Sequence, residues 1–141
     1  MSDPTLSNMT LETINELMQG SLIGHLGIEI LEIGDKFVKG KMPVDERTRQ
    51  PQGALHGGAS VSFAETLGGA GSAYYLNLEK QLPIGVEINA NHIQAATSGY
   101  VYGTATALHL GKRTHVWEIK IVGEDDKLIC ASRLTNTIID L

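Results

Sequence analysis

The chain has 141 residues, of which 42% are hydrophobic and 19% are charged, a balance typical of a folded globular protein. Its formal net charge of −5 disfavours non-specific binding to nucleic acid or to anionic lipid. The sequence shows no apolar run long enough to span a bilayer and no secretory signal, and its one cysteine, Cys130, excludes an internal disulfide. We therefore expect a single cytoplasmic domain over residues 1–141 that binds neither nucleic acid nor membrane.

The first part of the chain predicts short elements. Thr10 is expected to cap a short helix that ends at Gly20, and a turn follows it. Residues 27–44 predict two short strands joined by a turn, because apolar and polar residues alternate there. Residues 45–55 contain proline, glycine and charged residues, so we expect a loop in which Asp45 is solvated.

A long helix is predicted from about residue 57 to about residue 76. At about 100° per residue, one apolar stripe of this helix should face a sheet. That stripe consists of Phe63, Leu67, Ala70 and Tyr74. Beyond residue 82, four alternating segments predict strands, and in the first of them one face should hold Val86, Ile88, Ala90 and His92. Three consecutive strands with short connections indicate an antiparallel meander, so the predicted fold class is α+β, with one long helix against a curled antiparallel sheet.

Glu65 is the one acidic residue of the predicted long helix, and it lies on the side opposite the apolar stripe. Its neighbours on that side are nearly all small: Gly58, Val61, Ser62, Gly68, Gly69 and Ser72. A solvent-exposed helix face normally carries several charged residues, whereas this face carries one. We therefore interpret it as a surface for close approach of a second helix, or as the wall of a cavity where a ligand meets the acid.

The helix begins at the tripeptide His56-Gly57-Gly58. The unpaired N–H of Gly57, at the positive end of the helix dipole, is suited to stabilise a carbonyl oxygen that gains negative charge in acyl transfer. A tight turn into the helix explains the two glycines equally well. Gly57 and Glu65 are eight residues apart, or about 12 Å along the axis, too far to act together on one reacting group. Two antiparallel copies of the helix can supply both groups, which predicts a homodimer with shared sites.

Four segments of the chain share one family pattern: PVDERTRQPQGALHGGASVSFAETLG, GVEINANHI, HLGKRTHVWEIKI and ASRLTNTII. Together they resemble the hotdog-fold acyl-CoA thioesterases, in the branch related to 4-hydroxybenzoyl-CoA thioesterase. Within this branch the chain is most similar to the 1,4-dihydroxy-2-naphthoyl-CoA hydrolases of menaquinone synthesis and to the proofreading thioesterases of enterobactin synthesis. The resemblance implies a hotdog fold, dimers paired into a homotetramer, and an aromatic or medium-chain acyl-CoA substrate, with no cofactor besides the coenzyme A of that substrate.

The resemblance also implies roles for individual residues. Glu65 would be the nucleophile or general base, the Gly57 N–H would polarise the thioester carbonyl, and Gln50 and His56 would orient the thioester or the water. Relatives often carry a hydroxyl residue one turn after the acid, where this chain has Gly69. Gly85 would line the acyl site. The residues implied to contact coenzyme A are His92, Ile93, Gln94 and Ala95 in one loop, and His109, Leu110, Gly111, Lys112, Arg113 and Thr114 in one hairpin turn.

Several alternatives are weighed against this interpretation. The five histidines show no metal-ligand spacing, so no metal site is expected, and Cys130 lies in an alternating strand, which favours a buried small residue. Lys112 and Arg113 supply the local positive charge that a polyphosphate needs, yet a solvated hairpin tip would look the same. Two other functions stay open, a hydro-lyase acting on acyl thioesters and a non-catalytic acyl-CoA sensor.

Overall fold

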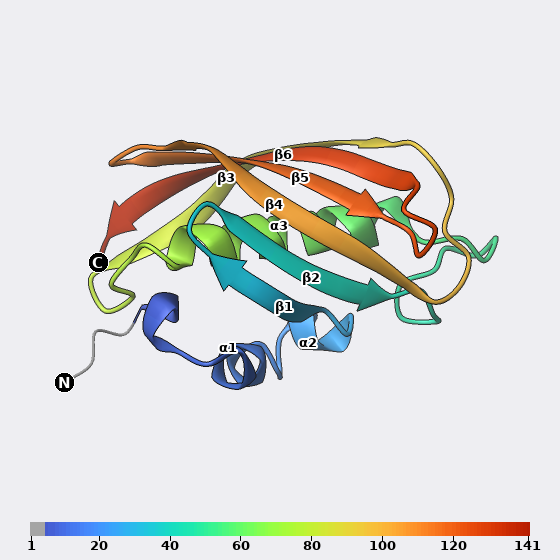
Figure 1. Ribbon diagram of the computed structural model, residues 1–141, viewed down its shortest axis with the longest axis horizontal. Coiled ribbons are helices and arrows are strands. Elements are labelled where there is room, and N and C mark those ends of the chain that lie inside the picture. Colours follow the sequence, from blue (N-terminus) through green and yellow to red (C-terminus); the bar gives the residue numbers. More distant parts are fainter. Residues whose placement is uncertain (1–4) are drawn as a thin grey trace.

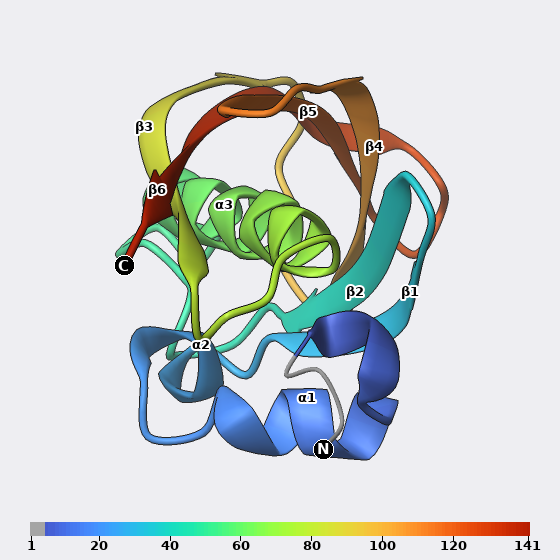
Figure 2. The same cartoon turned by 90° about the vertical axis from the view of Figure 1, so that its left-hand side faces the viewer.

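The structure, a computed structural model, describes residues 5–141. A six-stranded antiparallel sheet curls around one long helix, α3 (Gly57–Ala73), as Figures 1 and 2 show. The strand order is β1-β2-β4-β5-β6-β3. The strands are β1 (Glu29–Gly34), β2 (Phe37–Pro43), β3 (Gln81–His92), β4 (Tyr100–Leu110), β5 (Thr114–Val122) and β6 (Leu128–Asp140). The α+β prediction is confirmed, including the antiparallel pairing of consecutive strands β4, β5 and β6.

Three short helical elements precede the sheet: η1 (Leu6–Asn8), α1 (Leu11–Leu17) and α2 (Leu22–His25). Thr10 caps α1 as predicted, because its side-chain oxygen accepts a hydrogen bond from the backbone N–H of Thr13 at 3.1 Å. The segment expected to be a turn instead contains α2. In Figure 2 these elements lie below α3, on the side that the curled sheet leaves open.

The apolar stripe of α3 packs into the concave face of the sheet. Phe63 and Leu67 are fully buried and Ala70 is 6% exposed, as predicted, whereas Tyr74 is half-buried and lies just beyond the end of the helix. The sheet comes very close to this stripe at Gly103, where an added Cβ would lie 2.6 Å from Leu67. Glycine at that position therefore permits the contact between strand and helix.

The prediction that Gly68 and Ser72 share the open side of the helix with Glu65 is wrong. Gly68 packs under Leu134, and Ser72 is fully buried, because the sheet curls around more than one stripe of α3. Only part of the small-residue face therefore remains uncovered by the sheet.

A buried polar network joins α3 to the sheet through Ser72. The Ser72 hydroxyl oxygen accepts hydrogen bonds from Trp117 Nε1 and Asn136 Nδ2, each at 2.9 Å, and lies 2.8 Å from His115 Nδ1. Because the two donors occupy its lone pairs, the hydroxyl proton is left for His115 Nδ1, which assigns the other ring nitrogen as the protonated one. Burial lowers the pKa of His115, so the ring stays neutral at physiological pH.

The two edges of the sheet differ. At β1, the Asn15 side chain accepts from the N–H of Ile30 at 2.8 Å and donates to its carbonyl at 3.0 Å, so it occupies both groups as a neighbouring strand would. At the other edge, β3 pairs with β6 alone among the described residues. Val86 was predicted to share a face with Ile88, but the register of β3 shifts between Gly85 and Glu87, and Val86 is 58% exposed. This irregularity breaks the strict alternation on which that prediction depended.

Candidate active site

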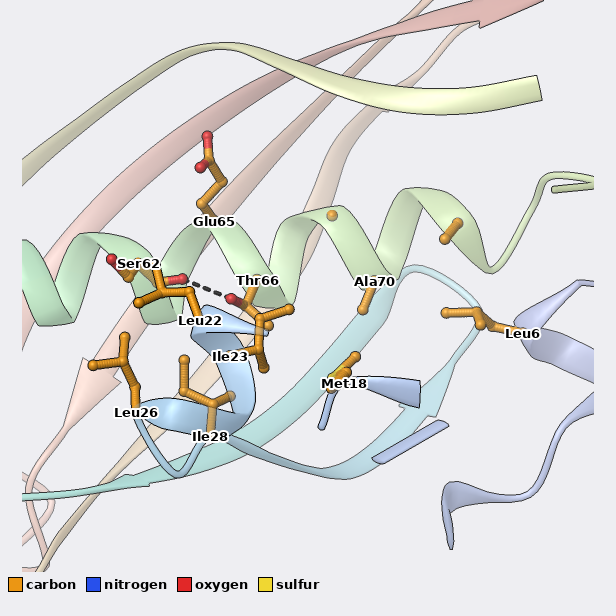
Figure 3. A pocket seen from close by; sticks show the side chains of 12 residues that line it. Leu6, Met18, Leu22, Ile23, Leu26, Ile28, Ser62, Glu65, Thr66 and Ala70 are labelled. Atoms are coloured by element: carbon orange, nitrogen blue, oxygen red, sulfur yellow. Dashed lines mark hydrogen bonds between the residues drawn. The ribbon is translucent and has the colours of Figure 1, made fainter. Parts of the chain in front are cut away.

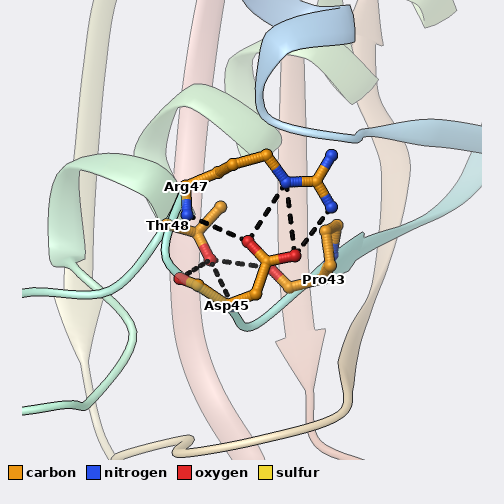
Figure 4. Close-up of polar contacts among 4 residues, drawn as sticks. All are labelled: Pro43, Asp45, Arg47 and Thr48. Carbon is orange, nitrogen blue, oxygen red and sulfur yellow. Dashed lines mark hydrogen bonds and ion pairs between the residues drawn. The ribbon is translucent and has the colours of Figure 1, made fainter.

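The loop that leads into α3 is fixed by its own side chains (Figure 4). Asp45 accepts hydrogen bonds from Arg47, the shortest at 2.7 Å, and Thr48 donates to the carbonyl of Pro43 at 2.7 Å. The prediction that Asp45 is merely solvated is therefore wrong. The hydrogen bond from Arg47 holds the pKa of the Asp45 carboxyl below its ordinary value. Because the N–H of His56 donates to the carbonyl of Thr48 at 2.8 Å, this loop also fixes the start of α3.

The first turn of α3 holds one free backbone donor. His56 caps the helix through Nδ1, which accepts from the N–H of Gly58 at 2.8 Å. The N–H of Gly57 has no hydrogen-bond partner within residues 5–141. The His92 ring lies against Gly57, where an added Cβ would be 2.8 Å from His92 Nε2. Glycine is therefore required here by contact, and its amide remains available to a ligand at the positive end of the helix dipole.

A cleft of about 350 Å³ opens beside this amide. Its lining residues are Gln50, Ala54, Leu55, Gly57, Ser60, His92, Ile93, Gln94, Ala95 and Ile129. Hydrogen bonds hold the far wall, because Ile93 donates to the carbonyl of Ile129 and Leu55 donates to the carbonyl of Ala96, both at 2.8 Å. The structure thus brings two predicted catalytic residues, Gln50 and Gly57, together with the first predicted group of coenzyme A contacts.

Glu65 borders a second and mostly apolar pocket of about 420 Å³, between α3 and the N-terminal elements (Figure 3). The lining residues are Leu6, Met18, Leu22, Ile23, Leu26, Ile28, Ser62, Glu65, Thr66, Gly69, Ala70 and Ala73. The Glu65 side chain is exposed and points toward β3, where a Cβ added to Gly85 would lie 2.7 Å from Glu65 Oε1. Gly85 therefore leaves room for the carboxylate. The apolar wall contributed by residues before 29 was missed by sequence reasoning, although Leu22, Ile23 and Leu26 together were a signal for it.

Two sets of predicted residues are not brought together within one chain. Gly57 and Glu65 line different cavities. The hairpin turn that carries Lys112 and Arg113 lies at the end of the molecule where α3 finishes, whereas the cleft beside Gly57 lies where α3 begins (Figure 1). In the hairpin, Arg113 forms an ion pair with Asp140, with Nη1 and Oδ2 3.0 Å apart.

Other candidate chemistry is scarce in the described part of the chain. Cys130 is buried as predicted, and burial raises the pKa of its thiol, which disfavours a nucleophilic role. Within residues 5–141, no group of three or more His, Cys, Asp or Glu side chains is placed to hold a metal ion. No helix of the same range is long and apolar enough to cross a bilayer.

The chain belongs to the thioesterase superfamily, whose family model matches residues 52–130. It has the hotdog fold that the resemblance implied, and it is a thioester hydrolase. These matches favour the thioesterase prediction over the hydro-lyase and sensor alternatives.

Individual relatives match nearly the whole chain. It is 46% identical to 1,4-dihydroxy-2-naphthoyl-CoA hydrolase of Escherichia coli, over 93% of this chain and 96% of the relative. It is 44% identical to proofreading thioesterase EntH of Cronobacter turicensis, over 93% of this chain and 95% of that protein. A crystal structure of a thioesterase from Haemophilus influenzae superposes with a TM-score of 0.90 at 46% identity, over 95% of this chain and 93% of that one.

Proposed function

We propose that the protein hydrolyses the thioesters of coenzyme A with aromatic acids, with 1,4-dihydroxy-2-naphthoyl-CoA as the preferred substrate. The observation that carries this proposal is the apolar pocket with one carboxylate, Glu65, at its rim. An aromatic acyl group buried there would place its carbonyl beside the acid, and apolar walls suit a ring. The name of the Escherichia coli relative supports the same substrate class, and the naphthoyl substrate would place the enzyme in menaquinone biosynthesis.

The second part of the proposal is a homodimer that completes each site. The free edge of β3 is available for a twofold antiparallel pairing with its copy, whereas Asn15 occupies the backbone groups of Ile30 at the edge of β1. Gly57 lies against His92, and Glu65 lies beside Gly85. His92 and Gly85 both lie in β3. If the twofold axis passes halfway between them, His92 of one protomer lies across from Gly85 of the partner subunit. This pairing carries the free amide of one chain toward the carboxylate of the other.

The same pairing would bring together the two predicted groups of coenzyme A contacts, which lie at opposite ends of α3 within one chain. An antiparallel copy of β3 brings its Gln81 end beside the His92 end of the first chain. The Gln81 end adjoins Asp140, which is the partner of Arg113 in the hairpin turn. Lys112 and Arg113 would then approach the cleft from the second subunit. In a protein of net charge −5, two exposed cations at this place suit the phosphates of coenzyme A.

The chemistry assigns separate tasks to these groups. The Gly57 N–H would donate to the thioester carbonyl oxygen, which gains negative charge as the carbon is attacked. Glu65 would either attack that carbon, giving a mixed anhydride that water hydrolyses, or remove a proton from the attacking water. In both routes the carbon–sulfur bond breaks, coenzyme A leaves as its thiol, and the acid is released. Gln50 and His56 would orient the thioester or the water from the subunit that supplies Gly57.

A substrate panel tests the activity. Thiol release would be measured with benzoyl, 1,4-dihydroxy-2-naphthoyl, phenylacetyl and straight-chain acyl-CoA, for the wild type and Glu65→Gln. Loss of a general base or nucleophile should lower kcat by roughly 10²–10⁴-fold, whereas Glu118→Gln, a control on the sheet, should have no effect. Equal rates for wild type and Glu65→Gln would refute the role of Glu65. Hydrolysis of straight-chain substrates alone would refute the aromatic preference.

Subunit mixing tests the shared site. Glu65→Gln removes the carboxylate, whereas Gly57→Ala keeps the N–H but sets a methyl against His92, which should displace this amide from the site. When the two inactive proteins are unfolded together and refolded, half of the dimers are hybrids, and each hybrid keeps one intact site. About a quarter of wild-type activity should return. No recovery would show that both groups act within one chain.

We further propose that the dimers pair into tetramers in the cytoplasm, which light scattering and cell fractionation would test.

A further inference from the structure

Five glycines lie in α3, and the structure explains four of them by contact. An added Cβ would lie 3.0 Å or less from a neighbouring side chain at Gly57, Gly58, Gly68 and Gly71. At Gly69 the same atom would meet nothing within 4 Å. Glycine inside a helix lowers stability by about 0.5–1 kcal/mol relative to alanine. No neighbouring protein atom explains why position 69 is glycine.

Gly69 lines the apolar pocket that Glu65 borders. It follows Glu65 by four residues, so it lies about 6 Å further along the helix axis on the same side of the helix. The pocket wall beyond it continues with small side chains, Ala70 and Ala73. Across the pocket stand larger apolar side chains, among them Ile23 and Met18 (Figure 3). The empty space at Gly69 is therefore part of the pocket interior, one helical turn away from the acid.

We propose that Gly69 determines the acyl specificity of this pocket, by leaving the space in which the distal ring of a two-ring acyl group lies. This inference rests on the proposed function, in which the acyl carbonyl sits beside Glu65. A group attached to that carbonyl must extend along α3 to bury its apolar surface, and its far end then reaches the wall at Gly69. A one-ring acyl group ends nearer the acid and depends less on this space. The pocket volume of about 420 Å³ is within the range that holds a drug-sized ligand.

A side chain at position 69 should act as a graded obstacle. Gly69→Ala adds one methyl where no atom is within 4 Å, so this variant should fold, and Gly69→Leu adds a bulkier group in a residue type that favours helix. The measured quantity is the ratio of kcat/KM for 1,4-dihydroxy-2-naphthoyl-CoA to kcat/KM for benzoyl-CoA. We expect this ratio to fall modestly in Gly69→Ala and by about tenfold or more in Gly69→Leu. Ile33→Leu, at a half-buried position of β1 outside the pocket lining, should leave the ratio unchanged.

The outcomes separate this inference from the proposal beneath it. If the wild type hydrolyses neither aromatic thioester, the proposed function fails. If the wild type hydrolyses both, and Gly69→Leu leaves the ratio unaltered, Gly69 does not determine specificity. If both substrates lose activity equally while light scattering shows fewer dimers, a side chain of the partner subunit occupies the space, and the inference is likewise overturned.

Discussion

Replacing Ser72 with alanine should destabilise the protein far more than the loss of one hydroxyl suggests. The Ser72 oxygen accepts from Trp117 and Asn136, and both donors are at most 1% exposed. Each buried N–H left without an acceptor costs about 1–3 kcal/mol, so the Trp117 N–H and the one Asn136 N–H not bonded to the carbonyl of Gly68 should together lower the free energy of unfolding by about 2–6 kcal/mol. The nitrogen of His115 that receives the Ser72 proton loses its partner as well.

Urea denaturation followed by tryptophan fluorescence measures this effect, at one fixed protein concentration because the proposed assembly would contribute to stability. The matched control is Ser62→Ala on the same helix. The Ser62 hydroxyl donates to the carbonyl of Gly58 at an exposed site, so its removal should change stability by less than about 0.5 kcal/mol. If Ser72→Ala were as stable as Ser62→Ala, the network would not hold α3 against the sheet, and the assignment of its donors and acceptors would be refuted.

Three further predictions follow from neighbouring features. Gly71→Ala would set a methyl 2.6 Å from the Trp117 ring and should be less stable than Gly69→Ala by about 1–3 kcal/mol, measured as a difference in urea midpoints; equal midpoints would contradict the packing described. Burial lowers the pKa of His115. Between the folded and unfolded pKa values, the His115 ring is therefore protonated in the unfolded chain and neutral in the folded chain. Stability should therefore fall as the pH drops below the ordinary value of 6.5, and level off below the folded pKa; His115→Gln should remove this step, and an unchanged pH profile would contradict it. Asn15→Leu removes the two hydrogen bonds that cover β1 and should cost about 1–3 kcal/mol while promoting self-association in light scattering; a monodisperse, equally stable variant would argue against that role.

Local patterns sufficed for much of the fold. The helical period predicted that Phe63 and Leu67 face the sheet, and both are buried. The Thr10 cap and the start of the long helix follow from rules that involve only a few adjacent residues. These features depend on short-range chemistry, which a single sequence contains.

The errors have a common physical origin in contacts between distant segments. How far the sheet curls around α3 decides that Ser72 is buried, and the irregularity at Gly85 decides that Val86 is exposed. The wall of the apolar pocket forms only when residues before 29 fold back onto α3. Gln50, Gly57 and His92 were each identified from the sequence, and they line one cleft, while their roles stay predictions. The separation of Gly57 from Glu65 followed from helix geometry alone.

The asparagine that covers β1 also bears on how large an assembly can become. A chain whose sheet had two unpaired edge strands could add further copies at both edges without limit, as a fibril does. Within residues 5–141, Asn15 covers the edge of β1 at Ile30 and the edge of β3 stays unpaired, so the proposed pairing through β3 would give a dimer in which each outer edge is covered by the Asn15 of its own chain. In that proposed dimer, no further chain would add to the sheet through its edges.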